Sequence, residues 1–253
     1  MINGINSREM ILEILLEIEE GEHSHVAIRN ALSKYQFLPK QDRAFITRVC
    51  EGTLEYRIQI DYIINSFSKV TVDKMKPAIR EILRSAVYQL KYMDSVPDSA
   101  VCNEAVKLAQ RKGFYNLKPF VNGVLRTIAR EMDQVRFPQK EDDLLKYLSV
   151  KYSMPEVLVT RWLEAYGEET TEKILADFLM EHPLTIRCRT YLNSKEEVIK
   201  SLESQGVHVA PAPYLPYAYS ISEFNHILAL DAFIKGKIVV QDVSSMLVAE
   251  VAD

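Results

Sequence analysis

A helical repeat of apolar residues runs through the first half of the chain and restricts its fold more than any other feature. The stretch KPAIREILRSAVYQLKYM (residues 76–93) places apolar side chains three or four positions apart, at Ile79, Leu83, Val87 and Leu90. Comparable patterns begin near Ser7 and continue to about residue 135. Such helices are stable when their apolar stripes pack together, so residues 1–136 are expected to form an all-α domain.

The pattern changes after RFPQKEDD (residues 136–143), a polar segment with a proline that is typical of a linker. Three more helices are expected after it, over residues 144–150, 155–166 and 171–180. PLTIRCRTYL then alternates like a half-buried strand, SKEEVIKSLESQG has the form of a capped helix, and VHVAPAP that of a second strand. Residues 137–235 are therefore expected to form a small α+β subdomain, which can present one sheet face to RNA.

The last residues, GKIVVQDVSSMLVAEVAD (236–253), have the form of a strand followed by a helix. A β-branched run that leads into an apolar helix is typical of the entry into an α/β unit. A single strand and helix cannot complete a parallel sheet. We therefore expect this segment to begin a further domain, with its apolar side chains lacking their partners: Val239, Met246, Leu247 and Val251.

Charge is distributed unevenly along the chain. The formal net charge of −4 argues against a generic nucleic-acid binder. Residues 107–136, however, hold seven basic side chains and two acidic ones, a local net charge of +5. This excess predicts phosphate binding, although a solvated helix face would show the same pattern. The candidate RNA-binding residues are Lys107, Arg111, Lys112, Lys118, Arg126 and Arg130.

The cysteines and histidines do not indicate a metal or redox site. Cys50, Cys102 and Cys188 lie far apart in apolar or helical contexts, and reduced, packed thiols are expected. His23 and His25 lack a third ligand nearby, so no metal is predicted. The chain also lacks a secretory pattern and an apolar run of about 20 residues, which a membrane span needs. A cytoplasmic protein without a membrane partner is expected.

Two segments of the helical part carry a distinctive set of motifs. REILRSAVYQLKYMDSVPDSAVCNEAVKLAQRKGFYNLKPFVNGVLRTI (residues 80–128) has a Tyr-rich helix end, a Val-Pro, an Asn-Glu-Ala-Val helix and a Phe-Val-Asn-Gly-Val-Leu helix. This segment resembles the NusB family of RNA-binding helical domains. QDRAFITRVCEGTLEYRIQIDYII (residues 41–64) is similar to the preceding helix of that family. The resemblance implies a NusB-like fold for residues 1–136.

Several residues of these motifs are expected to have structural roles. Gly52 is a possible break in its helix, and Gly123 is expected to let a neighbouring helix approach closely. Asp61 and Glu104 are expected to pair with arginines that lie on helices. Tyr88 and Tyr92 are expected to cover the edge of the core.

The NusB-like part is followed by three further segments, in the order SVKYSMPEVLVTRWLEAYG, HPLTIRCRT and GKIVVQDVSSM. This order resembles the ribosomal RNA cytosine methyltransferases of the RsmB (Sun) type. Members of this type join a NusB-like domain to a small RNA-binding subdomain and a Rossmann-like S-adenosylmethionine domain. The resemblance implies that residues 236–253 begin that last domain, in truncated form. It also implies that Gln241 and Asp242 border the pocket for cofactor and target base.

The catalytic groups of that type are not expected in this chain. The resemblance places two catalytic cysteines in Pro-Cys and Thr-Cys settings beyond a Gly-rich cofactor loop, whereas the cysteines here stand in Val-Cys-Glu, Val-Cys-Asn and Arg-Cys-Arg. We therefore expect this chain to be the RNA-recognition N-terminal part of a small-subunit ribosomal RNA cytosine-C5 methyltransferase. We expect it to be monomeric, inactive alone and without its own S-adenosylmethionine site. The alternative is a stand-alone NusB-like antitermination or ribosome-assembly factor.

Overall fold

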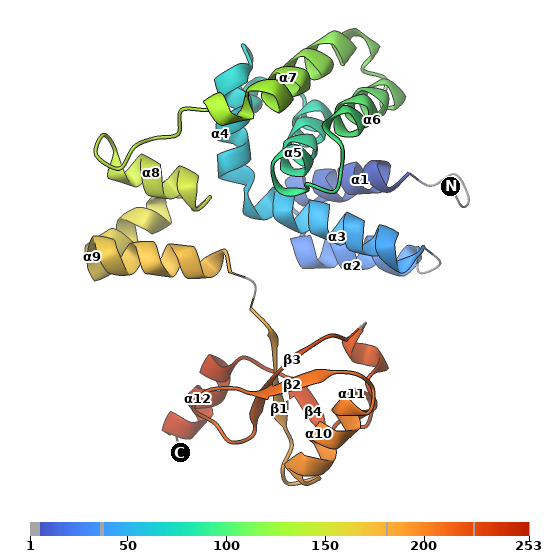
Figure 1. Ribbon diagram of the computed structural model, residues 1–253, viewed down its shortest axis with the longest axis vertical. Coiled ribbons are helices and arrows are strands. Elements are labelled where there is room, and N and C mark those ends of the chain that lie inside the picture. Colours follow the sequence, from blue (N-terminus) through green and yellow to red (C-terminus); the bar gives the residue numbers. More distant parts are fainter. Residues whose placement is uncertain (1–5, 36–37, 181, 225, 253) are drawn as a thin grey trace. The chain divides into compact units, whose positions relative to one another are not determined.

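The computed structural model describes residues 6–35, 38–180, 182–224 and 226–252, which form two compact units (Figure 1). The first unit extends to Leu179 and the second begins at Met180. The α-helices of the first unit are α1 (Ser7–Glu19), α2 (Ser24–Lys34), α3 (Lys40–Glu55), α4 (Arg57–Phe67), α5 (Pro77–Tyr92), α6 (Asp98–Arg111), α7 (Lys118–Glu131), α8 (Leu144–Lys151) and α9 (Glu156–Phe178). Short 3₁₀ helices are η1 (Val72–Lys74), η2 (Tyr115–Leu117) and η3 (Met132–Gln134).

Local sequence signals explain where several of these helices begin. The Asn6 side chain accepts hydrogen bonds from the backbone N–H groups of Arg8 and Glu9, at 2.9 and 3.2 Å, and so caps α1. Proline occupies the first turn of α5 and of α7, where its missing N–H costs no helical hydrogen bond.

Helix α5 is the central element of the helical core. It contacts α1, α3, α4, α6 and α7, which surround it in Figure 1. The stripe expected from the sequence faces inward, since Ile79, Leu83 and Val87 are at most 1% exposed. The expected all-α domain is confirmed over the described residues up to α7 and η3.

Two glycines have roles other than those expected. Helix α3 continues through Gly52, and a Cβ added there would lie 2.1 Å from Cζ of Tyr88 on α5. A Cβ added to Gly123 would meet no atom within 4 Å. The close approach between helices therefore occurs at Gly52, and Gly123 lies on an exposed part of α7.

Helices α8 and α9 belong to the first unit and not to the α+β part. The expected break between residues 166 and 171 is present as Gly167, whose φ of 74° and ψ of 175° are available almost only to glycine. The two helices share a small core in which Leu148, Val159 and Leu175 are fully buried. The segment expected to be a linker is also attached, because the Tyr62 hydroxyl donates to the carbonyl oxygen of Arg136 at 2.7 Å. The boundary between the compact units, at Leu179 and Met180, thus differs from the boundaries of the expected segments 1–136, 137–235 and 236–253. Residues 1–5 and 253 of those segments lie outside the described residues.

The second unit is one antiparallel sheet with helices. Its elements in chain order are β1 (Leu184–Cys188), α10 (Lys195–Glu203), β2 (His208–Pro211), β3 (Ala218–Ser222), η4 (Ile227–Ala229), α11 (Asp231–Ile234), β4 (Ile238–Val240) and α12 (Val243–Ala252). The strand order is β2-β3-β1-β4, and every neighbouring pair is antiparallel. This is a strand-helix-strand-strand-helix-strand arrangement in which β1 and β3 are central. The expected strand, helix and strand correspond to β1, α10 and β2.

Strand β4 pairs with β1 at the edge of this same sheet, whereas the sequence pattern predicted that it begins a further, Rossmann-like domain. Val240 lies opposite Ile186, and Ile238 opposite Cys188. A short β-branched run before a helix is the same in sequence whether its partner strand is parallel or antiparallel, so the pattern could not identify the pairing. In the helix that follows, Met246 is 1% exposed and packs on the sheet side, while Val251 is 84% exposed.

Candidate nucleic-acid interface

The six predicted RNA-binding residues lie on α6, on α7 and in the connection between them. Lys107 and Arg111 belong to α6, and Lys112 is its C-cap residue. Lys118 begins α7, which also carries Arg126 and Arg130. Arg126 joins the two helices, since its guanidinium donates to the side-chain oxygen of Asn103 on α6 at 3.4 Å and to that of Asn122 at 2.9 Å. The structure therefore places all six on one helical hairpin.

Three of these cations are already paired with carboxylates. The Lys112 ammonium lies 3.0 Å from Glu13 and 3.3 Å from Glu9, both on α1. Burial lowers the pKa of Lys112, but hydrogen bonds to Glu13 and Glu9 outweigh this effect and the pKa is raised. Lys107 pairs with Glu104 at 2.7 Å, and Arg130 with Glu131 at 2.6 Å.

The other three cations form no ion pair with a carboxylate within the described part of the chain. Arg111 and Arg126 are exposed, and Lys118 is partly exposed. The local excess of positive charge is therefore carried by fewer groups than the sequence suggests. The acidic α1 neutralises the α6 end at Lys112, a long-range pairing that charge counting along the chain could not reveal.

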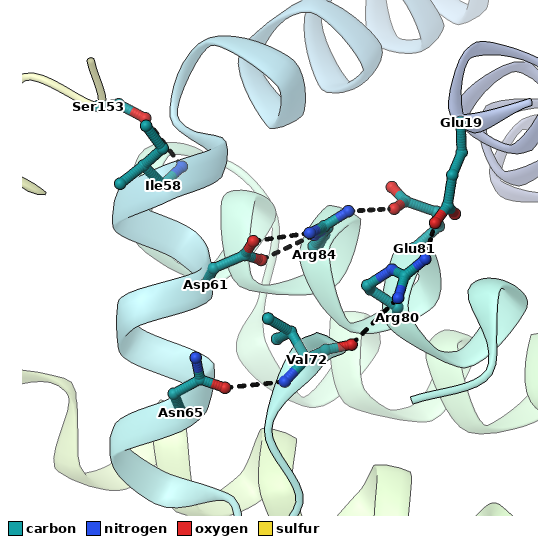
Figure 2. Close-up of polar contacts among 9 residues, drawn as sticks. All are labelled: Glu19, Ile58, Asp61, Asn65, Val72, Arg80, Glu81, Arg84 and Ser153. Carbon is teal, nitrogen blue, oxygen red and sulfur yellow. Dashed lines mark hydrogen bonds and ion pairs between the residues drawn. The ribbon is translucent and has the colours of Figure 1, made fainter. Parts of the chain in front are cut away.

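A second polar network joins α4 and α5 and is drawn in Figure 2. The Arg84 guanidinium binds both oxygens of Asp61, at 2.7 and 2.6 Å, and also Glu81 at 2.5 Å. Glu81 is 3% exposed, and burial raises its pKa against the opposing effect of Arg84. The expected Asp61–arginine pair is confirmed, whereas Glu104 binds Lys107 of its own helix.

The same network attaches the neighbouring elements, as Figure 2 also shows. Arg80 pairs with Glu19 and donates to the Val72 carbonyl oxygen at 3.2 Å, while the Asn65 side chain accepts from the Val72 N–H at 2.9 Å. The Ser153 hydroxyl oxygen accepts from the Ile58 N–H at 3.0 Å and so satisfies the start of α4. These charged groups bind one another, which makes them structural.

The two residues expected to border a cofactor pocket lie between β4 and α12. The Gln241 N–H donates to the Thr185 carbonyl oxygen at 3.2 Å and extends the β4–β1 ladder, and the Asp242 carbonyl oxygen accepts from the Met246 N–H at 3.0 Å. A Rossmann-type cofactor site needs a parallel strand followed by a Gly-rich turn. The antiparallel ladder and the Gln-Asp connection do not fit that requirement.

None of the three thiols is suited to be a nucleophile. All three are buried, and burial raises the pKa of each thiol. For Cys188 the pKa is raised to about 11. A catalytic cysteine needs the opposite, an accessible thiol with a lowered pKa.

Within the described ranges, no three His, Cys, Asp or Glu side chains gather as a metal site would need. No helix there is both long and apolar enough to cross a membrane.

Comparison with known proteins identifies two regions of the chain, and the second crosses the boundary between the compact units at Leu179 and Met180. The profile of the NusB family matches residues 5–130, and that of the Methyltr_RsmF/B-like, ferredoxin-like domain matches residues 154–227. The latter includes α9 and ends before β4. The crystal structure of PH0851 shares the fold, with a TM-score of 0.72, 24% sequence identity, and coverage of 99% of this chain and 56% of that one.

Two kinds of protein occur among the curated relatives. The probable ribosomal RNA small subunit methyltransferase B of Bacillus subtilis is 32% identical over 97% of this chain and 54% of its own length. Its counterpart in Synechocystis is 30% identical over 98% of this chain and 55% of its own length. The chain thus spans about half the length of these relatives. The transcription antitermination protein NusB of Dictyoglomus thermophilum is 33% identical over 51% of this chain and 85% of its own length. The chain therefore belongs to the NusB family, and it joins its NusB domain to a ferredoxin-like domain of the RsmF/B methyltransferase type.

Proposed function

We propose that this chain is the RNA-recognition portion of a small-subunit ribosomal RNA methyltransferase that modifies carbon 5 of a cytosine with S-adenosylmethionine. The observation that carries the proposal is the order of the two domains in one chain, together with similarity over 97% of its length to a methyltransferase of that name. Arg111, Lys118 and Arg126, which form no ion pair with any carboxylate of the described residues, supply the phosphate-binding charge on the helical hairpin.

Methyl transfer itself needs a reactive thiolate in addition to RNA recognition. S-adenosylmethionine would supply the methyl group, and the accessible thiolate would add to the cytosine ring. The buried Cys50, Cys102 and Cys188 cannot provide that thiolate. The isolated chain should therefore recognise RNA without binding the cofactor or methylating the base.

The experiment is an equilibrium titration of the purified chain with fragments of unmodified small-subunit ribosomal RNA, alongside non-ribosomal RNA of the same length and base composition. We expect tighter binding to one ribosomal fragment and an affinity that falls steeply with salt. Equal affinity for both RNAs would contradict specific recognition. Calorimetry with S-adenosylmethionine and a labelled-methyl assay should both be negative, and saturable cofactor binding would show that the active site has been misassigned.

A stand-alone antitermination or ribosome-assembly factor is the second candidate, favoured by the 33% identity to an antitermination protein over 51% of this chain. It predicts that RNA binding depends on the helical hairpin alone. Substitutions in the second unit would then leave RNA affinity unchanged. This outcome separates the two candidates.

A further inference from the structure

The sheet of the second unit has one apolar and one more polar face. Side chains alternate between the faces along each strand. Ile186 and Cys188 of β1 point into the core beneath α10, together with Ile221 of β3 and Ile238 of β4. By the strand pairing, the opposite face carries the intervening residues, which are Thr185, Arg187, His208, Ala210, Ala218, Ser220, Ser222 and Val239. Met246 of α12 covers this polar face at Ala218 but leaves Arg187 partly exposed.

Three cations gather at one end of the polar face. Arg187 lies opposite Val239 in register. The Arg189 N–H donates to the Lys237 carbonyl oxygen at 2.9 Å, so the ladder continues and places Arg189 and Lys237 on the same face as Arg187. The Arg189 guanidinium also lies against Gly236, where an added Cβ would be 3.5 Å from Nη1. We call these three residues the sheet cluster.

The sheet cluster is not neutralised within the described part of the molecule. No side-chain hydrogen bond or ion pair of Arg187, Arg189 or Lys237 occurs there, and the buried Nε of Arg189 has no acceptor. The polar face carries no carboxylate at any register position. Glu250 of α12 is bound by the Tyr217 hydroxyl. The cations Lys107, Lys112 and Arg130 on the helical hairpin differ in this respect, since each has a carboxylate partner.

We propose that the sheet cluster binds the phosphate backbone of RNA, an inference that rests on the proposed RNA-recognition function. Two planar guanidinium groups and an ammonium group match phosphate oxygens in charge and in hydrogen-bonding geometry. The hydroxyls of Thr185 and Ser222 on the same face suit ribose 2′-OH groups. Among the paired residues of this face only His208 has a ring for base stacking, so the face contributes affinity and orientation, and sequence is read elsewhere.

The alternation in HPLTIRCRT already places Arg187 and Arg189 two positions apart, on the strand face opposite Ile186 and Cys188. On its own this alternation predicted only a half-buried strand. It could not include Lys237, which joins the cluster through the β1–β4 pairing between segments far apart in the sequence.

The test is a salt titration of RNA binding by the full chain carrying Arg187→Gln, Arg189→Gln and Lys237→Gln together. The matched control carries Lys146→Gln, Lys173→Gln and Lys235→Gln, which remove the same charge from lysines that are paired with Glu156, Glu169 and Asp231. Because the first variant can no longer bind three phosphates, the slope of log K against log salt should decrease by about 2. The control should keep the wild-type slope.

Circular dichroism checks that both triple variants are folded, and Lys237→Gln alone serves if the triple variant is not. This single change should lower the slope by about 0.7. A slope equal to that of the wild type in the folded variants would overturn the assignment of the sheet cluster, whether or not the face serves another partner. An equal decrease in the control would also overturn it, as a general charge effect. Failure of the wild-type chain to bind RNA at all would instead remove the proposed function and the inference together.

Discussion

Among the described glycines, Gly52 is the one whose added Cβ would meet the closest neighbour. Gly52→Ala would bring Cβ to 2.1 Å from the Tyr88 ring, which itself packs near Tyr56 and Tyr92. We expect a loss of about 1–3 kcal/mol in the free energy of unfolding, because the ring must move within a packed core. Urea denaturation measures this loss.

Gly123→Ala is the matched control for that substitution. An added Cβ there has no neighbour within 4 Å, and alanine is better than glycine in a helix by about 0.5–1 kcal/mol. The control should therefore be as stable as the wild type or more stable. Equal stability of the Gly52 variant and the wild type would contradict the close approach of α3 to α5.

Arg111 and Lys112 are adjacent cations with different expected contributions to RNA binding. Arg111 is exposed and forms no ion pair among the described residues, so Arg111→Gln should lower the salt slope of RNA binding by up to about 0.7. Lys112 already binds Glu9 and Glu13, and Lys112→Gln should leave the slope unchanged. Fluorescence anisotropy between about 50 mM and about 200 mM salt distinguishes the two. The same effect from both variants would show that the carboxylates of α1 do not keep Lys112 from phosphate.

At the scale of elements, the sequence predicts what short-range periodicity determines. The helices of the first unit, the strand-helix-strand order after Pro183 and the break at Gly167 follow from spacing and glycine conformation. The partner of β4 and the neutralisation of Lys112 by α1 depend on contacts between distant segments. Local patterns do not specify such pairings. The sequence therefore assigns β4 to another domain and does not predict that Lys112 pairs with α1.

Glu172 of α9 attaches α8 and the segment before it. Its carboxylate binds the Lys151 ammonium at 3.0 Å, Lys140 at 3.2 Å and the Tyr152 hydroxyl at 3.1 Å. These hydrogen bonds, led by that from Lys151 and partly opposed by burial, lower the pKa of Glu172 to about 2. The stabilisation is therefore present above the ordinary carboxyl pKa and is lost as pH falls towards the lowered value.

Glu172→Gln should reduce the free energy of unfolding by about 1 kcal/mol near neutral pH, because these partly exposed contacts are individually weak. The difference from the wild type should disappear as pH falls from about 4.5 to about 2. Glu169→Gln on the same helix is the control, since Glu169 pairs only with the exposed Lys173 among described residues. If urea denaturation across this pH range showed the same loss of stability in both variants at every pH, the role of Glu172 would be contradicted.

At the scale of the whole molecule, each compact unit contributes one cationic surface to the proposed RNA recognition. The helical hairpin supplies Arg111, Lys118 and Arg126, and the sheet cluster supplies Arg187, Arg189 and Lys237. Two modest sites joined in one chain bind a long RNA more tightly than either could alone, provided that both can be engaged at once. The acidic α1 would repel phosphates, which favours contacts away from it.

Ultraviolet cross-linking of the chain to small-subunit ribosomal RNA, followed by mass spectrometry of the linked peptides, tests recognition by these two surfaces most directly. We predict cross-links within residues 98–131 of the helical hairpin and within residues 184–189 and 236–241 of the sheet. High salt should suppress both sets, because both depend on phosphate contacts. Cross-links confined to α1 and α2, or persistent at high salt, would contradict RNA recognition by the helical hairpin and the sheet cluster.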